Sequence, residues 1–208
     1  MPPHDTQDDH SRHEQHDEQN HDHDSGHSHD HDHSHDDKSS HPHHEVETVT
    51  FGVVTVSTSR TLEDDKSGDA LEALIESDGH TVGRRELVGD DRDGITATVA
   101  ALVGADGIEA VVLTGGTGLS PEDVTVEAVR PLTDQEIPGF GELFRMLSYD
   151  DIGPRALLSR AFAGSCDGVP VFCLPGSTQG ATFGTEELIL PTIGHVLGHT
   201  QERNCPEQ

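Results

Sequence analysis

One stretch, residues 111–125, constrains the fold of this chain more than any other part of its sequence. It opens with the apolar residues Val111, Val112 and Leu113, a run long enough for one buried strand. A glycine-rich loop follows, and then Asp123 precedes residues with the composition of a short helix. Strand, glycine loop, acid and helix stand in this order at anion sites of open α/β sheets, where ligands lie beyond the carboxyl ends of the strands.

The glycine loop itself indicates a phosphate ligand. Glycine lets backbone N–H groups approach a phosphate closely, and the N-terminus of a helix adds a favourable dipole. Asp123 is placed to bind Mg²⁺, which in turn binds phosphate oxygens. The loop lacks the lysine of a P-loop and the full G-x-G-x-x-G spacing, so a plain glycine-rich turn is the alternative. The residues of this predicted anion site are Thr114, Gly115, Gly116, Thr117 and Gly118.

Apolar periodicity predicts alternating strands and helices in the rest of the chain. The resulting β-α-β-α-β order favours an α/β protein with a mainly parallel sheet that helices cover. Pro138 and Gly139 are expected to stop any helix, and residues 156–163 fit either a strand or the end of a helix. The predicted strands are residues 49–56, 81–88, 108–113 and 169–174, and the predicted helices are residues 70–77, 94–103, 127–132, 141–147 and 185–197.

Three strand ends carry polar or glycine-rich segments that would meet at one edge of such a sheet. Asp90 follows the second strand, the glycine loop follows the third, and Pro175, Gly176 and Ser177 follow the last. Acids, hydroxyl groups and glycine turns in one crevice favour a site of phosphoryl or nucleotidyl transfer. The simpler alternatives are that Asp90 is a helix N-cap or a turn acid, and that Asp123 and Ser177 cap helices.

The charge of the chain excludes some partners. It has 40 acidic against 12 basic residues and a formal net charge of −28, and residues 46–208 alone hold 27 acids against 10 bases. Nucleic acid and anionic membranes need a basic patch, so neither is expected as the main partner. Dense carboxylates with few lysines keep proteins soluble at high salt, which predicts a halophilic source.

The first 45 residues differ in composition from the rest. They hold 14 of the 17 histidines and almost no apolar residues, so we expect residues 1–45 to be a disordered tail. Residues 46–200 are long enough for one domain, and residues 201–208 form a polar C-terminal tail. Neutral imidazole binds Zn²⁺, Ni²⁺ and Cu²⁺, so the first tail is either a solvated segment or a weak metal buffer. Its alternating histidines are His21, His23, His27, His29, His31, His33 and His35.

Cysteine usage and hydropathy indicate a cytoplasmic protein. Cys166, Cys173 and Cys205 form neither an even set nor a C-x-x-C pair, which favours a reducing compartment. No apolar stretch reaches 18 residues, and the N-terminus lacks the charged-then-apolar pattern of a signal peptide. We therefore expect no membrane segment.

Five short motifs follow one another: TGGTG at 114–118, DVT at 123–125, EIPGFGE at 136–142, LSRA at 158–161 and LPGS at 174–177. In order and spacing they resemble the MoaB/Mog family of molybdenum-cofactor biosynthesis proteins over about residues 47–198, and the single-domain MoaB type above all. The resemblance implies a three-layer α/β/α fold and assembly into homotrimers or homohexamers. It also implies that molybdopterin reacts with Mg-ATP to give adenylylated molybdopterin and pyrophosphate. A different protein of molybdenum-cofactor biosynthesis then supplies molybdate or tungstate.

The resemblance also implies roles for single residues. Asp123 matches the family's acid after the glycine loop, which acts on Mg²⁺ and the nucleotide, and Asp90 matches an essential acid after the second strand. The glycine loop and the segment ending at Ser177 would bind the nucleotide or the pterin phosphate. Glu136 and Ser148 lie in a matching segment and are further candidates for binding. Non-catalytic binding of molybdopterin, or a scaffold role, is the alternative function.

Three residues depart from the family's pattern. Val126 and Thr178 stand where the family often has proline, and Glu122 stands where it often has a basic residue. Glu122 bears most on function, because it would place a negative charge beside a polyphosphate.

Overall fold

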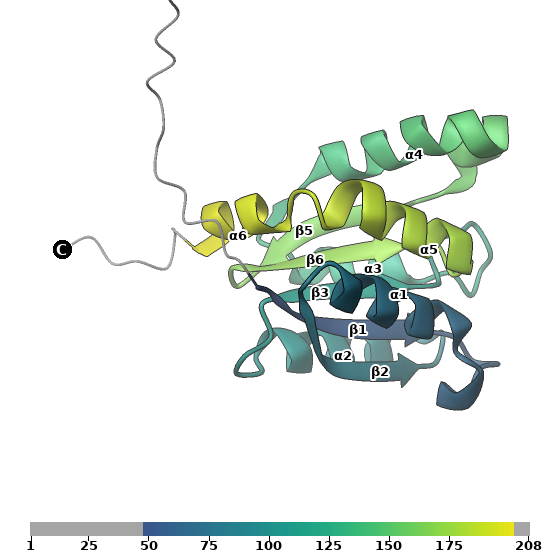
Figure 1. Ribbon diagram of the computed structural model, residues 1–208. Helices are drawn as coiled ribbons and strands as arrows, with labels where there is room; N and C mark the ends of the chain where they lie inside the picture. The colour runs from purple at the N-terminus through teal and green to yellow at the C-terminus, as the bar shows by residue number, and fades with distance from the viewer. Residues whose placement is uncertain (1–47, 202–208) are drawn as a thin grey trace, which may run out of the picture. The chain divides into compact units, whose positions relative to one another are not determined.

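The computed structural model describes residues 48–201, in which six strands form one sheet in the order β2-β1-β3-β6-β5-β4 (Figure 1). The first four of these run parallel, whereas β5 lies antiparallel to β6 and β4 antiparallel to β5. The predicted α/β fold with a mainly parallel sheet is therefore confirmed, and it has an antiparallel edge. The strands are β1 (Thr50–Val56), β2 (Thr81–Val88), β3 (Ala110–Thr114), β4 (Gln135–Glu136), β5 (Phe162–Cys166) and β6 (Val169–Leu174).

Helices cover both faces of this sheet (Figure 1). Apolar residues of α1, α4, α5 and α6 pack on one face, and those of α2 and α3 pack on the other. This is the three-layer α/β/α arrangement. The helices are α1 (Lys66–Ser77), α2 (Arg92–Val103), α3 (Thr125–Val129), α4 (Pro138–Ile152), α5 (Thr178–Gly184) and α6 (Ile193–Gln201). No helix within residues 48–201 is long and apolar enough to cross a membrane.

The central strands are apolar because both of their faces are buried. Side chains of a strand alternate between the two faces, so Val53 packs with the α1 side of the core while Val54 packs with the α2 side. Thr55 is the polar exception in the middle of β1, and it is fully buried. Its hydroxyl donates a hydrogen bond of 2.6 Å to Asp65, the residue that caps α1.

The predicted boundaries of α4 and of the last helical region are wrong, and the structure assigns residues 156–163, for which strand and helix were both open. α4 begins at Pro138 instead of being stopped there, because proline suits the first helical position, where no N–H bond is lost. Residues 156–163 divide between a 3₁₀ turn (Gly153–Leu158) and the start of β5. The last helical region begins at Thr178 and changes to a π-turn (Thr185–Ile189) just before Pro191, which has no N–H to donate.

The predicted tail over residues 1–45, with its seven alternating histidines, lies outside the described residues, and so does the predicted tail over residues 201–208 apart from Gln201, which ends α6.

Candidate functional site

A cavity of about 820 Å³ lies at the carboxyl edge of the parallel strands. The loops after β1, β3 and β6 form one part of its wall, and α4, α5 and the turn after α4 form the other. Predicted site residues in this wall are Gly115, Gly116, Thr117, Gly118, Asp123, Ser148, Pro175, Gly176 and Ser177. The other residues in the wall are Val56, Ser57, Arg60, Phe144, Asp151, Ile152, Ala156, Leu158, Ser159, Gln179, Gly180 and Phe183.

Two glycines give the loop after β3 its shape. Gly115 has φ +112° and Gly116 has φ +66°, which are conformations that L-residues rarely adopt. A Cβ at Gly115 would also collide with the carbonyl oxygen of Val56, and a Cβ at Gly116 would collide with Oγ1 of Thr125. No other residue fits either position without moving the chain.

The carbonyl groups of this loop are all engaged by the protein. Thr125 donates to the carbonyl of Gly115 through Oγ1 (2.8 Å) and to that of Gly116 through its backbone N–H (3.0 Å). Arg160 donates to Thr117 through its backbone N–H (3.0 Å) and to Gly118 through Nε (2.7 Å). By contrast, the N–H groups of residues 116–118 make no hydrogen bond within residues 48–201. Successive N–H groups of this kind form a binding site for an anion.

Arg160 holds the glycine loop and the following acid together. Besides its two bonds to the loop, its Nη2 donates to the carbonyl of Asp123 at 2.6 Å, and its Nη1 pairs with the carboxylate of Glu127. The hydrogen bond from Arg160 is the main reason that the pKa of Glu127 lies below its usual value. Arg160, which lies just before β5, therefore fixes the loop together with Thr125.

The carboxylate of Asp123 lies in the cavity wall. Its Oδ2 accepts a hydrogen bond of 2.7 Å from the backbone N–H of Ser120, which closes the turn between the glycine loop and α3. The expected alternative, that Asp123 caps α3, does not hold, because Val124 occupies the capping position and no side chain caps this helix.

Glu122 is exposed and does not line the cavity. Ser120 donates a hydrogen bond to its carboxylate, which lowers the pKa of Glu122 and keeps it ionised. Because water surrounds this charge, its repulsion of a ligand in the cavity is screened.

The segment after β6 lies beside the glycine loop in the cavity wall. Thr114 is buried at the end of β3, outside the cavity wall, and its hydroxyl donates to the carbonyl of Pro175 at 2.8 Å. Ser177 is the N-cap of α5, since its side chain accepts from the N–H of Gly180 at 3.2 Å. The capping alternative therefore holds for Ser177, which lines the cavity as well.

Asp90 stands at the same edge of the sheet but does not line the cavity. Its Oδ2 accepts from the backbone N–H of Thr58 at 2.6 Å, and its own N–H donates to Oγ1 of Thr58 at 3.1 Å. Of the two alternative roles for Asp90, the helix cap falls to its neighbour Asp91, which caps α2, while the bonds to Thr58 are those of a turn acid. Asp90 thus fixes the loop after β1.

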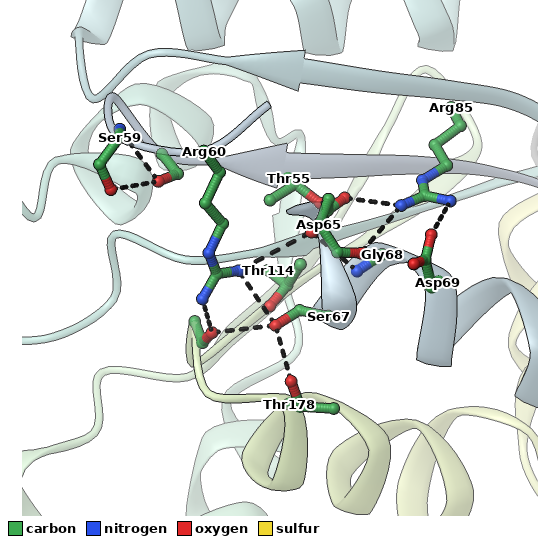
Figure 2. Close-up of polar contacts among 12 residues, drawn as sticks. Thr55, Ser59, Arg60, Asp65, Ser67, Gly68, Asp69, Arg85, Thr114 and Thr178 are labelled. Carbon is green, nitrogen blue, oxygen red and sulfur yellow. Dashed lines mark hydrogen bonds and ion pairs between the residues drawn. The ribbon is translucent and has the colours of Figure 1, made fainter. Parts of the chain in front are cut away.

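That loop carries Arg60, whose side chain points toward the start of α1 and the segment after β6 (Figure 2). The centre of this polar network is Asp65, which is fully buried. Its carboxylate accepts from Thr55 (2.6 Å), from the N–H of Gly68 (3.0 Å) and from Arg85 (2.9 Å). Burial raises the pKa of Asp65, but these three hydrogen bonds outweigh it, so the pKa lies below its usual value of 3.8.

Glu136, another predicted binding residue, lies away from the cavity. It belongs to β4 at the antiparallel edge of the sheet and forms an ion pair of 3.0 Å with Arg130. Ser148, from the same matching segment, does line the cavity from α4. The structure therefore brings together nine of the predicted residues and leaves Thr114, Asp90 and Glu136 outside the wall.

Mg²⁺ fits this arrangement, although residues 48–201 contain no cluster of three or more acidic, histidine or cysteine side chains for a metal. Mg²⁺ in phosphate sites is usually held by one or two carboxylates together with phosphate oxygens and water. Asp123 supplies one carboxylate in the wall beside the N–H groups that suit a phosphate.

Three residues that shape the site received no role from sequence reasoning: Arg60, Asp65 and Arg160. Arg160 stands inside one of the five motifs, which was a usable signal. Arg60 follows the polar residues after the first strand, where a cation at a ligand edge could have been noted. Asp65 gave no signal, because its burial depends on contacts with β1 and β2.

An α/β sheet with a glycine loop and an acid at the carboxyl edge of its parallel strands defines the class: a protein whose cavity suits a phosphorylated ligand. Residues 52–195 match the family described as "Probable molybdopterin binding domain". Over 145 residues the chain is 46% identical to Molybdenum cofactor biosynthesis protein B of Bacillus cereus, covering 69% of this chain and 86% of that protein.

Solved structures of similar proteins match the fold of this chain. A crystal structure of a Molybdenum cofactor biosynthesis protein B has a TM-score of 0.73 and 44% identity, covering 74% of this chain and 97% of that one. The tungsten cofactor synthesizing protein MoaB from Pyrococcus furiosus has a TM-score of 0.65 and 36% identity, with coverage of 74% and 98%. The chain belongs to the MoaB/Mog family of molybdenum-cofactor biosynthesis proteins.

Proposed function

We propose that this protein binds molybdopterin and adenylylates it with Mg-ATP, releasing pyrophosphate. The observation that carries the proposal is the meeting of three features in one cavity: the unpaired N–H groups of residues 116–118, the carboxylate of Asp123 and an apolar wall. The first two suit a polyphosphate with Mg²⁺. Phe144, Ile152 and Phe183 in the wall suit a flat ring such as adenine or a pterin.

In the proposed reaction, an oxygen of the terminal phosphate of molybdopterin attacks the α-phosphorus of ATP. A new P–O bond forms, the bond between the α-phosphorus and the bridging oxygen to the β-phosphorus breaks, and pyrophosphate leaves. Such a transfer asks the protein mainly for position and for stabilisation of charge. The glycine-loop N–H groups would hold phosphate oxygens in place, and Arg160 would keep those N–H groups aligned.

Asp123 would hold Mg²⁺, which neutralises charge on the phosphates when it is bound. Asp90 would act through the loop after β1, because its carboxylate is engaged by the N–H of Thr58. This differs from the direct catalytic role that the family resemblance implies for Asp90, and an Asp90→Asn variant separates the two. Asparagine keeps an oxygen that accepts from the N–H of Thr58, so the loop role predicts kcat and KM near those of wild type, whereas loss of a catalytic carboxylate should lower kcat and leave KM unchanged.

The test of the proposed function is release of pyrophosphate from ATP and Mg²⁺ in the presence and absence of molybdopterin. We expect release only when all three are present with the protein. Binding of molybdopterin without any release of pyrophosphate would leave a binding or scaffold protein instead.

We also propose that the protein assembles into a homotrimer or homohexamer in the cytoplasm. Apolar side chains on α4 and the turn after it are exposed, which supports burial by another copy. Those that lie outside the cavity wall are Leu143, Met146, Tyr149 and Leu157. Analytical ultracentrifugation of the wild type and of Met146→Glu tests this assembly, with dissociation expected in the variant. The buried free thiols of Cys166 and Cys173 support a reducing compartment.

A further inference from the structure

Among residues 48–201, Arg60 is the only basic residue that lines the cavity. The other ionisable groups in the wall are the carboxylates of Asp123 and Asp151. A cation at this position stands out in a chain with a formal net charge of −28. Its side chain is about one-third exposed, at 33%, so it reaches the solvent of the cavity.

Two hydrogen bonds of Arg60 go to neutral groups. Nη1 donates to Oγ of Ser67 at 3.1 Å, and Nη2 donates to the carbonyl of Gly176 at 3.1 Å, so both acceptors are neutral (Figure 2). Nη1 also forms a longer ion pair, of 3.7 Å, with the buried carboxylate of Asp65. Asp65 lies closer, at 2.9 Å, to Arg85, with which it forms a charged hydrogen bond.

The same contacts hold the Arg60 guanidinium still. Ser67 is fully buried, and its hydroxyl lies 3.1 Å from the carbonyl of Gly176 and 3.2 Å from Oγ1 of Thr178. The guanidinium therefore joins the start of α1 to the segment after β6, directly beside the cavity (Figure 2). A charge that is already fixed loses little side-chain entropy when a ligand binds.

We propose that Arg60 is an anion-binding residue of this cavity, and that it contacts a phosphate of the ligand from the loop after β1. The proposal deepens the proposed function and rests on it only for the name of the ligand. A fixed guanidinium, whose buried counter-ion Asp65 is contacted more closely by Arg85, matches phosphate oxygens in charge and in geometry. Its positive charge also offsets the repulsion that the carboxylates of Asp123 and Asp151 would exert on a phosphate.

The experiment measures binding of pyrophosphate and of ATP, each with Mg²⁺, by isothermal titration calorimetry of the full chain. We expect Arg60→Gln to weaken both affinities by about tenfold or more, because a charged hydrogen bond is lost. Arg60→Lys should recover part of the loss, since it keeps the charge. Arg84→Gln is the matched control: Arg84 is exposed on β2 and does not line the cavity, so its loss should change neither affinity.

The outcomes separate the two proposals. The affinity for pyrophosphate should fall less steeply with added salt in Arg60→Gln than in Arg84→Gln, because one charged contact is missing. Equal affinities for Arg60→Gln and Arg84→Gln would overturn the role of Arg60 while the adenylylation proposal stands. Pyrophosphate binding that depends on Arg60, without any binding of ATP, would support the anion site and contradict adenylylation. A wild-type chain that binds neither probe would overturn both.

Discussion

Asp65→Asn is the substitution whose effect follows most directly from the structure. Oδ2 of Asp65 accepts from both Thr55 and Arg85, while Oδ1 accepts from the N–H of Gly68. Asparagine keeps the shape of the side chain but replaces one oxygen with an NH₂ group. That group must face either Arg85 or the N–H of Gly68, and each of these is a donor. The variant therefore loses its charge and places two donors against each other in a fully buried position.

The cost can be worked from these contacts. A hydrogen bond between charged groups contributes about 1.5–3 kcal/mol, and an unpaired buried polar group costs about 1–3 kcal/mol. Removing one member of a buried ion pair typically costs about 3–5 kcal/mol. We expect Asp65→Asn to lose about 3 kcal/mol of unfolding free energy at pH 7. For a domain of this size that lowers Tm by roughly 6–12 °C.

The cost should depend on pH with a definite sign. The folded-state pKa of Asp65 lies below 3.8, its value in an unfolded chain. Its charge therefore stabilises the fold fully above that unfolded value, and the stabilisation is lost as the pH falls through the folded-state pKa. The difference in unfolding free energy between wild type and Asp65→Asn should be full at pH 7 and should shrink below about pH 4.

Urea unfolding of wild type and variant, at pH 7 and below about pH 4, measures these differences in unfolding free energy. Asp69→Asn is the control, because Asp69 also pairs with Arg85, at 2.6 Å, but its side chain is 60% exposed. Water screens such a pair, so this variant should lose no more than about 1 kcal/mol. Equal losses in Asp65→Asn and Asp69→Asn, or a loss in Asp65→Asn that does not change with pH, would refute the reasoning.

Three further predictions concern the cavity and the N-terminal region. Asp123→Asn should lower the rate of adenylylation by about a hundredfold or more, measured as pyrophosphate release, and a rate near that of wild type would remove Asp123 from the metal site. Gly116→Ala should lose about 1–3 kcal/mol of unfolding free energy, because alanine rarely adopts a φ of +66° and its Cβ would collide with Oγ1 of Thr125. A Tm equal to that of wild type would contradict this backbone conformation. Deletion of residues 1–45 should lower the Ni²⁺ bound per chain in equilibrium dialysis, and unchanged binding would leave those residues a solvated segment.

Local sequence predicted the part of the site that comes from consecutive residues. The glycine loop and Asp123 lie within ten positions, so one strand and one turn bring them to the cavity. The segment at 175–177 was placed correctly because parallel strands end at one edge of a sheet. The roles assigned to these residues in binding and catalysis stay predictions.

Residues from distant parts of the chain could not be placed in the same way. Arg160 reaches the glycine loop because β5 turns back antiparallel to β6, and the apolar pattern of residues 156–163 does not specify that direction. The start of α4 was wrong because proline both stops and begins helices, depending on which side of it the chain is helical. The position of the Arg60 side chain depends on hydrogen bonds to Ser67 and Gly176, which lie 7 and 116 positions away in the sequence.

The most direct test of the account follows the phosphorus atoms of ATP. The protein is incubated with molybdopterin, Mg²⁺ and ATP that carries label at either the α- or the γ-phosphorus, and the pterin product is isolated. We predict that the α-label appears on the pterin, with about one labelled phosphorus per pterin, and that the γ-label appears in pyrophosphate. A γ-label on the pterin, or no label on it from either position, would contradict adenylylation in this cavity.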